Sequence, residues 1–145
     1  MLGGFLGGAD PNLRDTKGNA PLHIASRAEV AGMLLASGAE RDAPGKGGCI
    51  PLCEASQRNH ADVVEVLLAS GADPNWAGVR GWTSLHAAAQ NGCLEAARVL
   101  IKRGASINPV FMDRFSPLDM AVLRAHEEMC QLLLRHGAQR CTKGT

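Results

Sequence analysis

The feature that most constrains this chain is a Gly-Ala pair that returns at nearly constant intervals. Successive pairs are separated by 30, 33, 33 and 33 residues and begin at Gly8, Gly38, Gly71, Gly104 and Gly137. A second marker, with Leu at its third position, keeps step at residues 20–23, 50–53, 83–86 and 116–119. Two markers in phase over four periods indicate stacked repeats, in which each unit packs mainly on its neighbours.

Each unit carries the signals for two helices. Thr83 and Ser116 are good N-cap residues, and the prolines of three units would occupy the first helical position, where a missing N–H costs nothing. Gly92 and Asn59 stand where the first helix should end in a left-handed conformation. Apolar residues at helical spacing follow, as in residues 63–68, and a glycine ends the second helix. The pattern predicts an all-α fold.

The second marker also carries a resemblance to a known family. The segments Ala20-Pro21-Leu22-His23 and Thr83-Ser84-Leu85-His86 resemble the T-P-L-H-x-A signature of the ankyrin repeat. The resemblance extends over about residues 8–140 and implies an ankyrin-repeat solenoid of helix–turn–helix units linked by β-turn fingers. It implies that His23 and His86 tie adjacent turns together, and that the chain binds proteins rather than catalysing a reaction.

The markers divide the chain into one repeat domain with short ends. We expect a partial repeat at residues 1–12 and an ankyrin-repeat domain at 13–141, followed by a tail at 142–145. The units of the domain are 13–42, 43–75, 76–108 and 109–141. Because the chain opens in mid-unit, the amino end is expected to be an uncapped edge or to continue a longer array.

Three departures from the repeat stand out. Leu22 and Leu34 are 12 residues apart where Leu52 and Leu67 are 15 apart, so the first full unit is three residues short. The loss falls around residues 26–28 and predicts a truncated first helix or a tightened turn between helices. In the last unit Arg114 replaces the turn glycine and Asp119 replaces the motif histidine, as suits a divergent terminal unit.

Composition narrows the class of protein. Aromatic residues make up 3% of the chain, so the core must be built from Leu, Val, Ala and Ile. Residues 1–74 carry six basic and nine acidic side chains, and residues 75–145 carry nine and five, which gives −3 and +4. The density of basic residues is too low for a protein that binds nucleic acid. No apolar run approaches the roughly 18 residues of a membrane span. We expect a monomer or one part of a hetero-complex.

Cysteine usage bears on the compartment. The five cysteines are odd in number and lack the spacing of a disulfide framework, and no N-x-[ST] acceptor occurs. Both points favour a reducing compartment, so we expect a cytoplasmic or nuclear location.

The aromatic residues are concentrated where the fingers should be. Trp82 and Phe115 share one variable site in adjacent units and are expected to stand side by side, available as hot spots for binding. In the alternative interpretation, these rings pack over their own turns. The candidate protein-binding residues of the fingers are Trp76, Arg80, Trp82, Phe111, Met112, Arg114 and Phe115.

The concave face of the first helices is the second candidate surface. The resemblance places there the polar side chains Gln57, Arg58, Gln90, Asn91 and Arg124. Arginines beside aromatic rings suit a peptide with acidic and apolar residues. For each single charge, the alternative is an ordinary solvated face.

Other kinds of site find little support in the sequence. Cys49-x3-Cys53 with His60 invites a zinc site, but structural zinc needs a second ligand pair, so small packing residues are the favoured interpretation. Gly45-Lys46-Gly47-Gly48 lacks the spacing of a phosphate loop. Cys53 and Asp119 occupy the place of His23 and His86, and no single chemistry could use all three residue types. We expect no catalytic residue, metal or cofactor.

The sequence therefore predicts a non-catalytic module that binds a protein or peptide through its fingers and concave helix face. Two narrower roles stay open. One is the substrate-recognition part of a larger assembly such as a SOCS-box ubiquitin ligase adaptor. The other is a small inhibitor of cyclin-dependent kinases. The chain resembles that class of short ankyrin arrays in having one abbreviated repeat near its amino end. An enzyme is the least favoured alternative.

Overall fold

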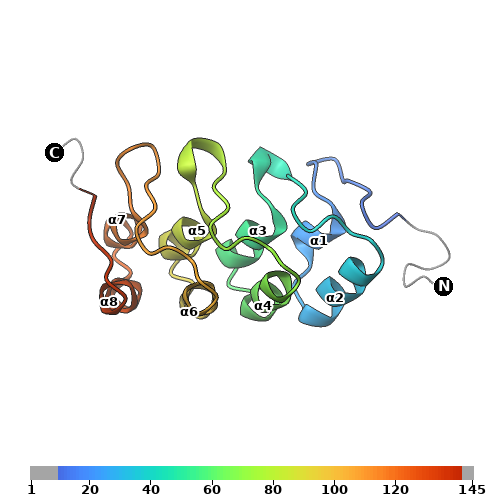
Figure 1. Cartoon of the computed structure of the whole chain (residues 1–145). Coiled ribbons are helices and arrows are strands. Elements are labelled where there is room, and N and C mark those ends of the chain that lie inside the picture. Colours follow the sequence, from blue (N-terminus) through green and yellow to red (C-terminus); the bar gives the residue numbers. More distant parts are fainter. Residues whose placement is uncertain (1–9, 142–145) are drawn as a thin grey trace.

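The computed structural model describes residues 10–141 and shows a row of helix pairs (Figure 1). The partial unit expected at residues 1–12 therefore lies mostly outside the described residues, and the tail at 142–145 lies wholly outside them. The pairs are α1 Pro21–Ile24 with α2 Ala28–Ala36, α3 Pro51–Gln57 with α4 Ala61–Ala69, α5 Ser84–Asn91 with α6 Leu94–Lys102, and α7 Pro117–Leu123 with α8 Glu127–Arg135.

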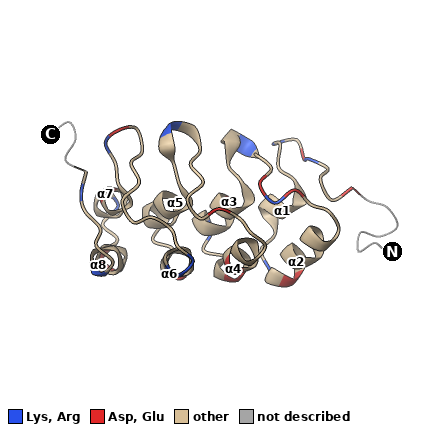
Figure 2. Cartoon of the chain, viewed as in Figure 1, with Lys and Arg blue, Asp and Glu red and all other residues tan. Residues whose placement is uncertain are grey.

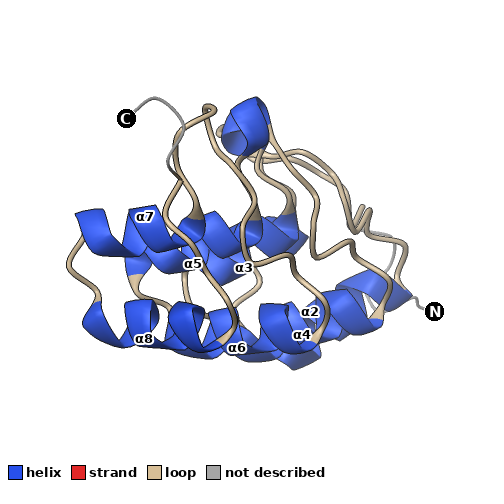
Figure 3. Cartoon of the chain, turned by 60° about the vertical axis from the view of Figure 1, so that its left-hand side comes forward, coloured by secondary structure: helices blue, strands red, loops and turns tan. Residues whose placement is uncertain are grey.

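The helices form two layers. Helices α3, α5 and α7 lie in an inner layer and α2, α4, α6 and α8 in an outer one, while the loops between units project as fingers from one side (Figure 3). Short 3₁₀ turns, η1 Lys46–Gly48 and η2 Val79–Gly81, form the tips of two fingers. Within residues 10–141 the only β-pairing is an isolated bridge in each of the last two fingers, Ala77–Thr83 and Phe111–Phe115. The predicted all-α solenoid is confirmed.

The ends of the inner helices follow the predicted chemistry. The side chains of Thr83 and Ser116 accept hydrogen bonds from the N–H groups of His86 and Asp119, which satisfies donors that a helix start leaves open. At the same position in the first two units, Ala20 and Ile50 provide no such cap. The helix starts of the later units are therefore better satisfied than those of the earlier ones.

The turn between the two helices of a unit needs a left-handed residue. Gly92 has φ 66°, as predicted, and Asn59 has φ 59°. In the last unit Ala125 takes the same conformation with φ 56°. A Cβ atom at Gly92 would also come within 2.9 Å of the His126 ring, so glycine at this position avoids a close contact as well as easing the positive φ.

The core is a continuous stripe of leucines at the same place in every unit. Leu34, Leu67, Leu100 and Leu133 of the outer helices are each at most 1% exposed. Small alanines fill the space between neighbouring helices, and no aromatic side chain is fully buried in the described residues. The predicted aliphatic core is confirmed.

The short first unit loses its residues from the inner helix. Helix α1 has four residues, where α3, α5 and α7 have seven, eight and seven. Helix α2 keeps the nine residues of the other outer helices. The truncated first helix, one of the two predicted outcomes, is the one observed.

The last finger turns one residue earlier than its neighbours. Positive φ values fall on the pairs Gly47–Gly48 and Arg80–Gly81 in the preceding fingers, but on Met112 and Asp113 here. Two positive φ values in succession are the mark of a type I′ turn. Arg114, which replaces the turn glycine in the sequence, does not need its positive φ, because the turn has moved to the two preceding residues.

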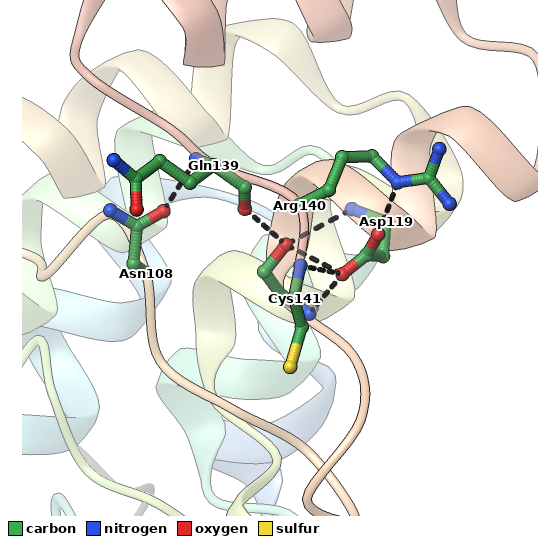
Figure 4. A network of polar contacts seen from close by, with 6 residues as sticks. Asn108, Asp119, Gln139, Arg140 and Cys141 are labelled. Carbon is green, nitrogen blue, oxygen red and sulfur yellow. Dashed lines mark hydrogen bonds and ion pairs between the residues drawn. The ribbon is translucent and has the colours of Figure 1, made fainter. Parts of the chain in front are cut away.

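Asp119 closes the carboxyl end of the solenoid. Its Oδ2 accepts from the backbone N–H groups of Ser116 (2.9 Å) and Cys141 (2.8 Å), and its Oδ1 pairs with Arg140 (Figure 4). Burial acts to raise the pKa of this carboxyl, but the hydrogen bonds outweigh burial and hold the pKa below its usual value. The change from histidine to aspartate thus serves to hold the last segment.

Candidate protein-binding groove

A groove of about 930 Å³ runs between the fingers and the inner helices, mainly over the first three units. Its helix wall is formed by Ile24, Cys53, Glu54, Gln57, Arg58, Gln90 and Met120. Its finger wall is formed by Asp15, Lys17, Asn19, Lys46, Gly47, Gly48, Cys49, Trp76, Gly78, Val79, Arg80, Trp82 and Phe111.

Trp82, Phe111 and Phe115 form one cluster with His86 beside this groove. Trp82 stacks on His86 with ring centroids 5.3 Å apart, and Phe111 meets Trp82 edge to face at 4.8 Å. Phe111 also contacts Phe115 at 6.5 Å. The pairing expected for Trp82 and Phe115 is therefore corrected, because Phe111 contacts both rings.

The aromatic rings of the fingers are partly structural. Trp76, Trp82 and Phe115 are half-buried and pack against the core, as the alternative interpretation of these rings supposed. Below them, His86 accepts at Nδ1 from the Thr83 N–H (3.2 Å), and its Nε2 lies 2.8 Å from the Phe115 carbonyl. Burial lowers the pKa of His86, so this histidine favours its neutral form. Two of the three rings, Trp76 and Trp82, also line the groove.

A glycine allows Trp76 to lie in the groove. A Cβ atom at Gly78 would come within 2.9 Å of the Trp76 ring. Because two carbon atoms cannot approach so closely without a steric clash, a larger residue at position 78 would displace the ring. The third finger therefore presents an aromatic wall.

Seven of the twelve predicted site residues line the groove: Gln57, Arg58, Trp76, Arg80, Trp82, Gln90 and Phe111. The other five lie outside it. Arg114 is exposed and sits 5.6 Å over the Phe115 ring, and Met112 is exposed at the fingertip beside it. Asn91 donates to the Ala87 carbonyl, and Arg124 is exposed at the end of α7.

Several groove residues were missed by sequence reasoning. Lys17 and Lys46 are exposed at the first two fingertips, and Val79 is 65% exposed at the third. A signal was present: each of the first three tips has a cation at one of two adjacent positions, in Thr16-Lys17, Lys46-Gly47 and Val79-Arg80. Because the cation changes position within the pair, a search at a single repeat position does not find it.

Both acidic side chains that line the groove are bonded to groups within the chain. Glu54 pairs with Arg58 at 3.2 Å. Asp15 accepts from the backbone N–H groups of Asn19 and Lys17, both at 2.9 Å, and the hydrogen bond from Asn19 is the main cause that lowers its pKa. Lys17, Lys46, Arg58 and Arg80 outnumber these two anions, so the groove has an excess of positive charge.

The two cysteines of the groove do not form a metal site with their neighbours. Cys49 and Cys53 are free thiols, and the side-chain hydrogen bond with Cys53 raises the pKa of Cys49, with burial adding to it. The Cys49 side chain is therefore a neutral thiol at neutral pH. Within residues 10–141 no cluster of three or more His, Cys, Asp or Glu residues could hold a metal ion.

Comparison with known families agrees with this geometry. A family model described as ankyrin repeats (three copies) matches residues 2–77 and again residues 75–143. The chain belongs to the ankyrin-repeat family. A search of curated proteins found no match. Ankyrin repeats are generally protein–protein interaction modules, and the groove lies between the fingers and inner helices of this ankyrin array. No helix of this ankyrin array within residues 10–141 has the length and apolar character to cross a membrane.

Proposed function

We propose that this ankyrin-repeat chain is a non-catalytic module that binds another protein or peptide in the groove over its first three units. The observation that carries the proposal is the gathering of both tryptophans, four exposed cations and the polar ends of α3 and α5 along one continuous groove. Exposed aromatic area beside arginine is typical of interface hot spots. The proposal assigns the chain no catalytic residue and no cofactor, and it includes an intracellular location, supported by five free thiols.

The narrower roles are not part of this proposal. Nothing in residues 10–141 favours a ubiquitin ligase adaptor or a kinase inhibitor over a general binding module. The groove alone supports the binding of a segment of protein, and the partner's identity has to come from capture.

Charge reversal in the groove tests the proposal. Affinity capture from cell lysate, read out by mass spectrometry, would compare the wild-type chain with an Arg58→Glu/Arg80→Glu double variant. Both arginines are exposed, so the helical circular dichroism spectrum should not change. We expect the captured partner to be lost because the groove then repels an acidic surface.

Arg124→Glu is the matched control. Arg124 is an exposed arginine of the same concave side that does not line the groove. We expect this variant to capture the partner as the wild type does. Equal capture by the double variant and by the wild type would overturn the placement in the groove, and equal loss in both variants would place binding across the wider concave face.

A further inference from the structure

We propose that the groove binds an extended acidic segment of its partner in the polyproline II conformation, with carboxylates at every third residue. This inference rests on the proposed function and adds the chemistry and the spacing of the partner. It draws on the placement of charge, the periodicity of the fingers and the small residues beneath them.

A cation stands at the tip of each of the first three fingers, whereas α2 and α4 carry acidic residues (Figure 2). The fingertip cations are Lys17, Lys46 and Arg80. The two acids of the groove, Asp15 and Glu54, are already bonded to partners within the chain. An incoming carboxylate therefore meets a row of three exposed cations.

The spacing of that row sets the conformation of the ligand. Packed helices have axes about 8–10 Å apart, and each unit carries one finger, so successive fingertips are separated by about the same distance. A polyproline II helix has 3 residues per turn and rises about 3.1 Å per residue, which gives a repeat of about 9 Å. Side chains at positions i, i+3 and i+6 of such a segment then point to the same side.

A β-strand would match this row less well. A strand alternates its side chains with a period of 2, so residues three apart point to opposite faces. Carboxylates three residues apart can therefore meet three fingertips from one side in the polyproline II conformation but not in a strand. The backbone of that conformation has no internal hydrogen bonds.

The groove also has a place for the residues between the carboxylates. Trp76, Trp82 and Val79 offer apolar surface at the third finger, and Ile24 is 54% exposed on the helix wall. Aromatic-lined grooves are a known type of receptor for proline-rich polyproline II segments. The inferred ligand therefore has prolines or other apolar residues between acidic ones, with an apolar residue next to the carboxylate that meets Arg80.

Intrinsic fluorescence tests the inference without a label. The chain has two tryptophans, and both line the groove. The probe is a ten-residue peptide without Trp or Tyr that has Glu at positions 2, 5 and 8 and Pro or Leu between them. A second peptide has the same composition with three adjacent glutamates, and a third has phosphoserine in place of each glutamate.

We expect the spaced glutamate peptide to change the fluorescence of the full chain and to bind about ten-fold more tightly than the peptide with adjacent glutamates. Raising the salt concentration should weaken this binding, because the contacts are exposed. Lys46→Glu should weaken it about ten-fold, whereas Lys102→Glu, an exposed charge of α6 outside the groove, should not change it.

Three results would overturn the inference. Equal affinity for the spaced and adjacent peptides would show that binding does not depend on carboxylates at every third residue. Binding of the phosphoserine peptide alone would assign the row to phosphate rather than carboxylate. Binding of neither acidic peptide, with partner capture still sensitive to Arg58→Glu/Arg80→Glu, would reject this ligand while the proposed function stands.

Discussion

The junction between the first and second units and the junction between the third and fourth are built alike but differ in one hydrogen bond. At the later junction Nε2 of His126 lies 2.9 Å from the Gln90 carbonyl of the preceding unit. Between the second and third units the equivalent Cys93 thiol donates to the Gln57 carbonyl at 3.3 Å. At the first junction His60 holds this place, and its buried Nδ1 has no partner among the described residues.

The three residues missing from α1 explain the difference. Gln57 and Gln90 each lie five residues after the motif leucine of their unit. In the first unit the residue at that distance from Leu22 is Arg27, which is already the N-cap of α2. The deletion thus removes the acceptor of a bond between units and leaves the leucine stripe intact, so the units remain stacked at this junction without that bond.

The largest effect that can test this comparison is a cavity in the stripe. Leu100→Ala in α6 should lower the free energy of unfolding by about 2–5 kcal/mol, because the side chain is fully buried between neighbouring units. Leu34→Ala removes the same atoms from α2, whose neighbour Val30 is 42% exposed where the equivalent Val63 is fully buried. Since repeat units contact mainly their neighbours, we expect its damage to concentrate in residues 13–42.

Urea denaturation and hydrogen exchange measured by mass spectrometry distinguish the two leucine variants. Leu34→Ala should speed exchange in α1 and α2 well before α5 and α6 lose protection. If Leu34→Ala reduced protection equally over residues 13–42 and 76–108, the solenoid would unfold as one unit and the comparison of its two ends would fail.

A smaller effect is expected at the histidine that ties the third unit to the fourth. His86→Ala leaves the Thr83 N–H and the Phe115 carbonyl without their partner, which should cost about 1–3 kcal/mol at pH 7.5. Burial lowers the pKa of His86 in the folded state, so below about pH 6.5 the unfolded chain binds a proton that the folded chain resists. The stabilisation from His86 is therefore complete above that pH and declines as the pH falls.

The measurement is the difference in unfolding free energy between wild type and His86→Ala from pH 7.5 down to pH 5. We expect this difference to shrink with falling pH, and the other histidines cancel because both proteins contain them. A difference that stays constant or grows would contradict the direction assigned to the pKa of His86.

Much of this fold could be predicted because its determinants are local. The N-caps Thr83 and Ser116, the left-handed Gly92 and the shortened first inner helix each follow from a few adjacent residues. The helix period and the repeat interval then leave one way of stacking the units.

The site was harder to predict because its residues meet only through the stacking. The contact of Phe111 with Trp82 depends on where the last finger turns, and two adjacent residue pairs could have provided that turn. The groove cations Lys17 and Lys46 lie at different positions of their fingers, so no alignment of the repeats brings them together. His60 lacks the bond that His126 makes through Nε2, because the residues that would supply its acceptor are absent from another unit.

The smallest effect tests the missing bond directly. His126→Ala should cost about 1 kcal/mol more than His60→Ala, because only the former loses a hydrogen bond to the preceding unit. Loss of the imidazole packing is common to both variants and cancels in the difference.

Inserting three helix-forming residues after Ile24 would lengthen α1 and supply the missing carbonyl. In that background His60→Ala should cost as much as His126→Ala, and a double-mutant cycle measured by urea denaturation isolates this coupling. If His60→Ala already costs as much in the natural chain, the shortened helix is not what sets the first junction apart.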